Sequence, residues 1–289
     1  MELRVLRYFL AVAEEGSMTH AAETLHTTQS NLSRQLANLE RECGHKLFER
    51  GARRVTLTEG GVYLRRRAAE IVELADRTQQ ELVVFDEVVS GSVHVGAIET
   101  RRFYYLTRAM DGLRRVYPRI TFDLMSGSNT ELVEMLDRGL LDLSLLVEPV
   151  DLAAYDYLRL PVREEFGVLT RADSPLAKLP AVTPADLRDR PLLVSHQQFE
   201  GNVFSGWFVT DPDALNVVAT FNLVTNAATL VAQGVGNALA FDGLVDRGGE
   251  VPLVFRPLDP PVEAGLVLVW KKSVPLTRAT RLYLDQLRA

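Results

Sequence analysis

Apolar residues at intervals of three and four predict three helices near the start of the chain. Their buried faces consist of Leu6, Phe9, Leu10 and Ala13 in the first helix, Ala21, Ala22 and Leu25 in the second, and Leu32, Leu36 and Leu39 in the third. Gly16 and Gly44 are suited to ending the first and third helices, and Ser17 is a good N-cap for the second. The chain is therefore expected to begin with a small helical bundle.

The polar face of the third helix carries an unusual set of side chains. Gln29, Ser30, Ser33 and Arg34 lie opposite its leucines, near its N-terminal end. Surface helices are more often built from Glu and Lys, whereas Gln and Arg bind base edges and Ser reaches phosphates. The pattern is typical of the recognition helix of a helix-turn-helix. The alternative is a solvated bundle in which these residues are caps and turn formers.

A β-hairpin is expected after the third helix. Leu47 and Phe48 anchor it, and residues 55–57 alternate as a short strand. Its turn is flanked by Arg50, Arg53 and Arg54. Such a tip on its own is more often a solvated turn, but beside a recognition helix its arginines favour contact with DNA phosphates or a narrow minor groove.

A heptad pattern follows over residues 59–89. Its apolar seam consists of Leu64, Ala68, Ile71, Ala75, Thr78, Leu82, Phe85 and Val89. A helix of this length extends for about 45 Å, and such a rod cannot bury its stripe against itself. The pattern favours pairing with a second helix. The alternative is that the helix packs along its own domain.

From Gly91 onward, strands alternate with helices. Strand-like stretches at 92–97, 120–125 and 142–147 are separated by helical segments near 106–116 and 131–140. A second set of strands follows at 166–170, 191–196, 217–221 and 237–241. This spacing is typical of βαβ units with a parallel sheet.

Charge is distributed unevenly along the 289 residues, whose net charge is −6. Residues 1–67 contain eleven Lys or Arg against eight Asp or Glu, so this part carries +3 and the remainder −9. A basic head on an acidic body indicates a DNA-contacting domain joined to one that does not bind DNA. A single cysteine, Cys43, and an N-terminus unlike a signal peptide favour the cytoplasm. No apolar run is long enough to cross a membrane.

Signals of catalysis are weak. The five histidines lack metal-ligand spacing, and no P-loop, G-x-S-x-G or complete G-x-G-x-x-G motif is present. We therefore expect neither an enzyme nor a bound metal or cofactor.

The stretches FLAVAEEGSMTHAAETLHTTQSNLSRQLANLE and LFERGARRVTLTEGG resemble the winged helix-turn-helix of the LysR-type transcriptional regulators. By position, the resemblance implies that Gln29, Ser30, Ser33 and Arg34 contact DNA from the third helix, and Arg53 from the wing. Ser30 departs from the family, where many members have Pro as the first helical residue. The similarity continues through DSPLA, TPADL, FNLVTNAA, GVGNALA, FRPL and VWKK, so it covers nearly the whole chain.

The resemblance implies a multidomain chain with an α-rich head and an α/β effector domain. The expected domains are a winged helix-turn-helix over 1–58, a dimerising linker helix over 59–89, and an effector-binding domain over 90–289, whose subdomain I spans about 90–161 and 267–289 and subdomain II about 162–266. Similar subdomains form periplasmic solute-binding proteins. The implied partners are double-stranded DNA with a pseudo-palindromic operator, a second copy of the chain in a homodimer or homotetramer, RNA polymerase and a small-molecule effector.

The effector is expected between the two subdomains. Thr100, Ser126 and Ser128 lie where strands lead into helices, and Ser195, His196 and Phe241 are the candidates from the second subdomain. Open α/β sheets bind ligands at the carboxyl ends of strands, where helix N-termini favour anions, so a carboxylated metabolite is predicted. The alternative is that Ser128 only caps its helix and Thr100 only fills a turn. The family often has Arg at the position of His196.

The rival interpretation is a cytoplasmic α/β solute-binding protein or enzyme with an accessory helical domain. The basic N-terminal part, the long helix with a heptad pattern and the lack of catalytic motifs in the sequence favour a transcriptional regulator.

Overall fold

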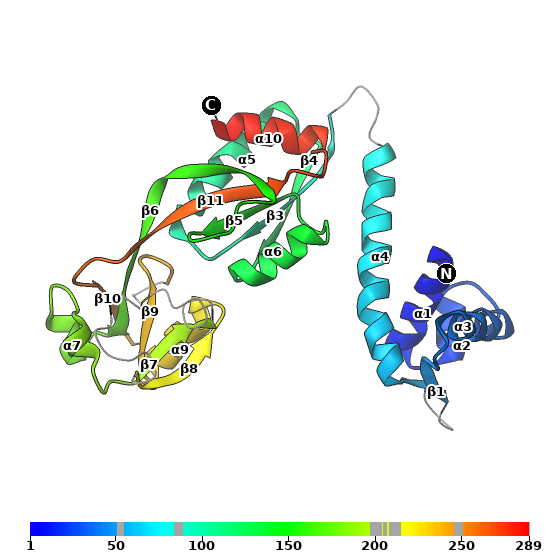
Figure 1. Cartoon of the computed structure of the whole chain (residues 1–289), viewed down its shortest axis with the longest axis horizontal. Coiled ribbons are helices and arrows are strands. Elements are labelled where there is room, and N and C mark those ends of the chain that lie inside the picture. The colour runs from blue at the N-terminus through cyan, green and yellow to red at the C-terminus, as the bar shows by residue number, and fades with distance from the viewer. Residues whose placement is uncertain are drawn as a thin grey trace. The chain divides into compact units, whose positions relative to one another are not determined.

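A computed structural model describes residues 1–50, 55–83, 89–196, 204, 207, 215–245 and 251–288. The chain divides into two compact units, Met1–Asp86 and Glu87–Ala289 (Figure 1). The first is the head with its long helix, and the second is the α/β body.

The first unit contains the three predicted helices and the hairpin. Its elements are α1 (Leu3–Glu15), α2 (Met18–Thr24), α3 (Gln29–Cys43), β1 (Phe48–Arg50), β2 (Val55–Leu57) and α4 (Glu59–Val83). Gly16 and Gly44 follow α1 and α3 with φ of 62° and 70°, the left-handed conformation that ends a helix. The Ser17 hydroxyl accepts a hydrogen bond from the His20 amide, as expected of an N-cap. The predicted helices, caps and strand are thus confirmed.

The long helix α4 packs onto the head through part of the predicted heptad seam. Ala68 is fully buried in the head core, and Leu64 packs against that core. Ile71 is 42% exposed, and the ring of Tyr63, outside the seam, is 68% exposed. A straight α-helix drifts relative to a 3.5-residue repeat, so one stripe cannot face a partner along the whole helix. The first part of the seam therefore packs along its own domain, which corrects the prediction of one continuous pairing stripe.

The C-terminal end of the predicted seam also differs from the expectation. The described part of α4 ends at Val83, and Val89 is buried in the core of the second unit. The side chains of Leu82 and Phe85 lie outside the described residues.

The described residues of the second unit form nine strands. They are β3 (Gly91–Ala97), β4 (Ile120–Ser126), β5 (Leu143–Val147), β6 (Tyr155–Arg171), β7 (Leu192–Ser195), β8 (Val217–Phe221), β9 (Asn237–Phe241), β10 (Leu253–Pro257) and β11 (Glu263–Lys271). Their order is β4-β3-β5-β11-β6-β9-β7-β8, and β10 also pairs with β6. The pairs β3–β4, β3–β5, β7–β8 and β7–β9 are parallel, whereas every pair that includes β6 or β11 is antiparallel. The sheet is therefore mixed rather than wholly parallel.

Strand β6 belongs to both halves of this unit (Figure 1). It pairs with β11 as far as Glu165, and with β9 and β10 from Phe166 and Gly167 onward. The chain passes from one half of the sheet to the other at this point, just beyond Pro161, and it returns to the first half at β11.

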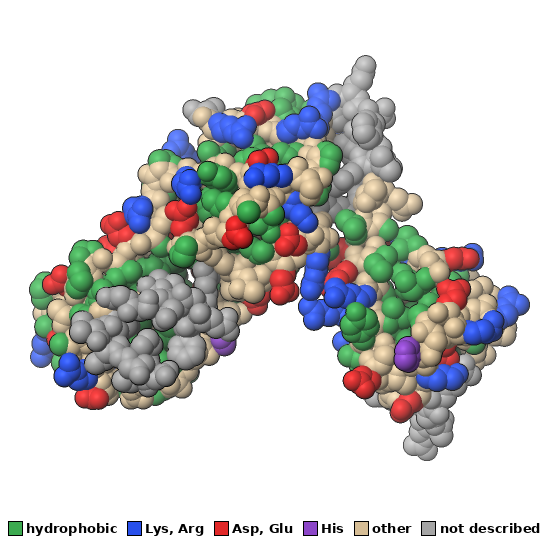
Figure 2. Space-filling view, viewed as in Figure 1, with side chains coloured by type: hydrophobic (Ala, Val, Ile, Leu, Met, Phe, Trp, Pro, Cys, Tyr) green, Lys and Arg blue, Asp and Glu red, His purple; other side chains and the backbone are tan. Residues whose placement is uncertain are grey.

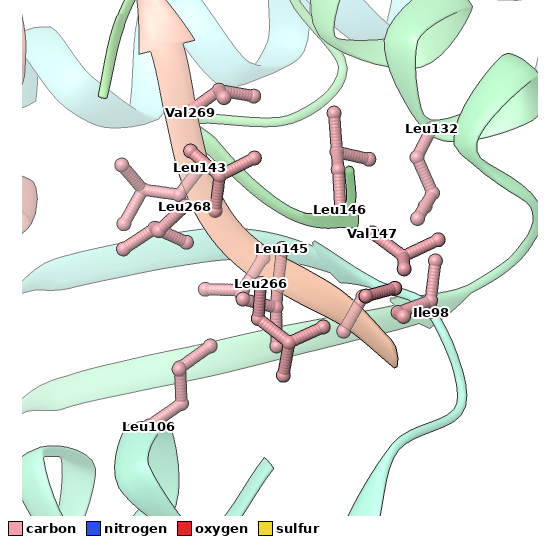
Figure 3. Packing of buried hydrophobic residues seen from close by; sticks show 14 of the residues in the cluster. Ile98, Leu106, Leu132, Leu143, Leu145, Leu146, Val147, Leu266, Leu268 and Val269 are labelled. Atoms are coloured by element: carbon pink, nitrogen blue, oxygen red, sulfur yellow. The ribbon is translucent and has the colours of Figure 1, made fainter. Parts of the chain in front are cut away.

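Helices cover both subdomains. They are α5 (Tyr104–Val116), α6 (Asn129–Asp137), α7 (Pro184–Leu187), α9 (Val224–Ala232) and α10 (Arg278–Arg288), with short 3-10 helices η1 (Arg101–Phe103) and η2 (Pro175–Lys178). Every residue of β5 is buried. In Figure 3, Leu146 lies on the side of Leu132 in α6, and Leu266 on the side of Leu106 in α5. Strand β5 is thus buried on both faces, as its largely apolar sequence favours.

A partly buried carboxylate joins α3 to the hairpin. One carboxylate oxygen of Glu40 accepts hydrogen bonds from the amides of Leu47 and Phe48, at 2.9 and 3.2 Å, and the other lies 3.0 Å from Lys46 Nζ. Burial opposes ionisation, but these three donors outweigh it and hold the pKa of Glu40 below its ordinary value. Ionised Glu40 therefore stabilises the folded head.

We predict that Glu40→Gln weakens the attachment of β1 to α3. Hydrogen bonds to a charged group contribute about 1.5–3 kcal/mol and neutral ones about 0.5–1.5 kcal/mol, so loss of the charge should cost about 1.4 kcal/mol. Amide protection at Leu47 and Phe48, measured by hydrogen exchange, should then fall about tenfold. Because the folded pKa is lowered, the difference should be complete above the ordinary Glu pKa of about 4.3 and disappear as pH falls through the folded value. Glu42→Gln, on the same helix but 57% exposed, is the control. Equal protection in both variants would contradict this role of Glu40.

Candidate DNA interface and ligand cavity

The predicted DNA-contacting side chains of α3 lie on its outer face. Gln29, Ser30 and Arg34 are exposed, and Ser33 is partly exposed, whereas the leucines on the opposite face are buried. Arg34 Nη2 donates to Asn31 Oδ1 at 3.2 Å, which holds the guanidinium along the first turns of the helix. The first helical residue is Gln29, so Ser30 is the second and its hydroxyl lies 3.2 Å from Thr28 Oγ1.

The turn before α3 fixes how this face is presented. His26 adopts a positive φ of 50°, and the Thr27 amide donates to the Ala22 carbonyl at 2.9 Å. Ala21 and Ala22 are buried, and their small side chains let α2 lie close to its neighbours. The buried faces are thus used within the bundle, and the polar face of α3 remains open.

The hairpin is anchored to the end of α1. Strands β1 and β2 are antiparallel, with Phe48 opposite Leu57, and the Val55 amide donates to the Gly16 carbonyl at 2.9 Å. The hairpin tip, including the predicted DNA contact Arg53, lies outside the described residues.

The described residues also bear on metal binding and on membrane insertion. No group of three or more His, Cys, Asp or Glu there could hold a metal ion, and none of the described helices is long and apolar enough to span a membrane. Acidic and basic side chains are interspersed over the visible surface (Figure 2).

The second unit contains a cavity of about 390 Å³. It is bordered by the carboxyl ends of β3, β5, β7, β8 and β9 and by the first turns of α6 and α9. Its described apolar lining residues are Ile98, Val147, Pro149, Phe166, Phe221, Val224, Leu239, Ala240, Phe241 and Leu244. The polar side chains that reach it are Glu99, Ser128, Asn129, Thr130, Glu148, Ser195, His196 and Asn222. An apolar enclosure with a few polar groups is typical of a small-molecule site.

Four of the six predicted effector residues border this cavity, namely Ser128, Ser195, His196 and Phe241. Thr100 and Ser126 are not among its described lining residues. Ser126 is exposed at the end of the edge strand β4, where it pairs with Ala97. The strand ends thus indicated the edge of the sheet at which the cavity lies, without specifying which residues line it.

Thr100 has a structural role instead. Its hydroxyl accepts from the Arg102 amide at 2.9 Å and donates to the carboxylate of Glu164 on β6. Glu164 is only 2% exposed, and burial raises its pKa above the ordinary value although the Thr100 hydrogen bond and the charge of Arg102 oppose the shift. Thr100 therefore supplies a partner to a buried carboxyl group, and its role as a ligand contact stays a prediction.

Ser128 borders the cavity and also caps α6. Its hydroxyl accepts from the Glu131 amide at 3.3 Å, while its own amide and hydroxyl donate to Glu131 Oε2 at 2.7 and 2.8 Å. These bonds hold the pKa of Glu131 below its ordinary value. Ser128 thus caps its helix, as the alternative interpretation expects, and it also borders the cavity.

Sequence reasoning missed the carboxylates Glu99 and Glu148 and the amide of Asn129. The carboxamide of Asn129 donates to the Val147 carbonyl at 2.7 Å and accepts from its amide at 3.1 Å, which ties α6 to the end of β5. Glu99 Oε2 accepts from the Val224 amide at the start of α9, at 2.5 Å. The only signal in the sequence was that Glu148 directly follows β5 and Glu99 lies two residues after the end of β3.

Comparisons with known proteins identify both units. Residues 3–62 match the bacterial regulatory helix-turn-helix of the LysR family, and residues 86–289 match the LysR substrate binding domain. The Hca operon transcriptional activator HcaR of Escherichia coli is 31% identical over 280 residues, which cover 94% of this chain and 93% of the relative.

Solved structures agree in fold over the full length. Full-length CbnR in complex with its target DNA has a TM-score of 0.76 at 21% identity, covering 100% of this chain and 99% of CbnR. Full-length OxyR from Pseudomonas aeruginosa has a TM-score of 0.58 at 26% identity and covers 100% of both chains. These relatives are transcriptional regulators rather than enzymes. The chain belongs to the LysR family of bacterial DNA-binding transcriptional regulators.

Proposed function

We propose that the outer face of α3 reads the operator in the major groove. The observation that carries this proposal is the exposed group Gln29, Ser30 and Arg34, with Ser33 beside it, on the first two turns of a helix whose other face is buried. Arg binds guanine and Gln binds adenine with two hydrogen bonds each, while Ser contacts phosphates or bases. Arg53 on the wing contacts the backbone and strengthens binding without specifying sequence.

The regulator acts on a pseudo-palindromic operator as a homodimer or homotetramer. Support comes from α4, where Tyr63, Ile71 and Leu74 are exposed on a helix too long to be covered by the head. Pairing two heads at a fixed separation suits two half-sites on DNA. The proposed setting is the cytoplasm, with RNA polymerase as the partner through which transcription changes.

A small-molecule effector binds in the cavity of the second unit and changes the affinity or geometry of DNA binding. Ser128, Ser195, His196 and Phe241 are its candidate contacts among the residues that the sequence singled out. Two of the neutral hydrogen-bond donors expected for a carboxylated effector, Thr100 and Ser126, are not among the described lining residues of the cavity. The proposal is therefore an organic molecule whose body fits the apolar walls.

We predict that Arg34→Ala relaxes the sequence preference of the regulator. Removal of a base-reading Arg should reduce discrimination at one base pair by about 1–3 kcal/mol. The measurement is a gel-shift titration on an operator located by genome-wide mapping of bound DNA, and on single-base variants of it.

Arg41→Ala is the matched control for this experiment. Both arginines are exposed on α3 and bond to an Asn three residues earlier, but Arg41 lies in the last turn of the helix. Arg41→Ala should leave base preference unchanged. Identical binding profiles of the two variants would refute the recognition-helix assignment.

We predict that Ile71→Asp dissociates the assembly. A charge placed in an apolar interface is strongly unfavourable, so light scattering at micromolar concentration should detect smaller particles than for the wild type. Glu73→Gln, at an exposed position of the same helix, should leave the mass unchanged. A wild-type chain that is monomeric under these conditions would refute the dimer.

We predict that Thr130→Trp makes the regulator unresponsive to its effector. Thr130 is exposed in the first turn of α6 and borders the cavity, so an indole at this position occupies the ligand's space. Transcripts from bound promoters should stop varying with carbon and nitrogen source, while operator binding in vitro remains. Thr229→Trp, exposed on α9 and outside the described lining, is the control. A normal response of Thr130→Trp would place the effector elsewhere.

A further inference from the structure

The cavity is acidic as well as apolar. Two carboxylates, Glu99 and Glu148, border it, and His196 is the one basic side chain among its described lining residues. Among the described lining residues, no Lys or Arg is present to pair with a carboxylated ligand.

Both helix N-termini at the cavity are already used by side chains of the protein. Ser128 and Glu131 form a reciprocal capping box at the start of α6. At α9 the N-cap residue Leu223 has no capping side chain, and the Val224 amide donates instead to Glu99 of the other subdomain. Glu99 thus occupies, with its own negative charge, the helix end that an anionic ligand would need.

The two cavity carboxylates lie at one edge of the first sheet. Glu99 and Glu148 follow β3 and β5, parallel neighbours in which Ala97 pairs with Leu145. Arg159 Nε lies 2.9 Å from Glu148 Oε1, so part of that charge is compensated. Glu99 is bonded through one oxygen to a neutral amide, and a carboxylate has lone pairs for further donors.

Aromatic rings complete the enclosure. Phe166, Phe221 and Phe241 border the cavity, and the centroids of the Phe166 and Phe241 rings are 4.5 Å apart. The face of an aromatic ring attracts an organic cation, and this attraction increases when water is excluded. Carboxylates and aromatic rings around one small cavity together suit an ammonium group on an apolar body.

We propose that the effector is a small organic amine, protonated at neutral pH, whose ammonium group binds to Glu99 and whose apolar body packs against Phe166, Phe221 and Phe241. This inference rests on the proposed function, in which the cavity is the effector site. Because Glu99 also bonds to α9, the ammonium group acts on the contact that joins the two subdomains at the cavity.

The test uses probe pairs that share an apolar body and differ in charge: benzylamine with benzoate, 2-phenylethylamine with phenylacetate, and isoamylamine with isovalerate. Calorimetry on the full-length protein at neutral pH should detect binding of at least one amine, with its acid partner at least tenfold weaker. Glu99→Gln retains an acceptor for the Val224 amide and removes the charge. It should weaken amine binding at least tenfold and reduce the preference for amine over acid.

Glu165→Gln is the charge-matched control, because Glu165 is exposed on β6 and outside the described lining of the cavity. It should leave both affinities unchanged. Tighter binding of the acids, equal loss in both Glu variants, or no binding by any probe would overturn the amine assignment. The Thr130→Trp response distinguishes the two proposals: if that variant is unresponsive in cells but no amine binds the wild type, only the ligand class is wrong.

Discussion

The antiparallel pairing of β6 with β11 is the constraint on which the α/β body depends. These two strands are the crossing strands between subdomains, and β6 changes partners between Glu165 and Phe166. Each half of β6 is therefore bonded into a different part of the sheet, and the continuous backbone of this strand connects the two parts. This crossing also explains why the sheet is mixed. The chain leaves the first half of the sheet along β6 and returns along β11, which lies antiparallel beside β6.

The crossing point is joined to the cavity by the turn after β3. Thr100 donates to the buried carboxyl of Glu164 on β6, and the preceding residue, Glu99, bonds to the start of α9. One turn thus contacts both the crossing strand and the second subdomain. A ligand that competes for Glu99 acts directly on this turn. This turn therefore links the occupancy of the cavity to the positions of the strand ends that surround it.

In the head, burial of one helix face determines what the other face can do. Leu32, Leu36 and Leu39 are all buried, which orients α3, and Glu40 bonds this helix to the hairpin. Polar residues between the leucines must then face outward. The same requirement acts on α4, where Ala68 is held in the head core while Ile71 and Leu74 are exposed.

Sequence alone determined the features that depend on local periodicity and capping. The three head helices, the ends at Gly16 and Gly44, most strands of the body and the outer face of α3 could be predicted, because each depends on residues within one element. Strands β10 and β11 and the first part of β6 were not predicted. Tertiary structure decided which side chains meet. Glu99 and Glu148 look like ordinary surface carboxylates in the sequence, and Thr100 looks like a ligand contact. Only the register of β3 against β5 and the passage of β6 past Thr100 assign them to the cavity and to Glu164, because those contacts join residues far apart in the chain.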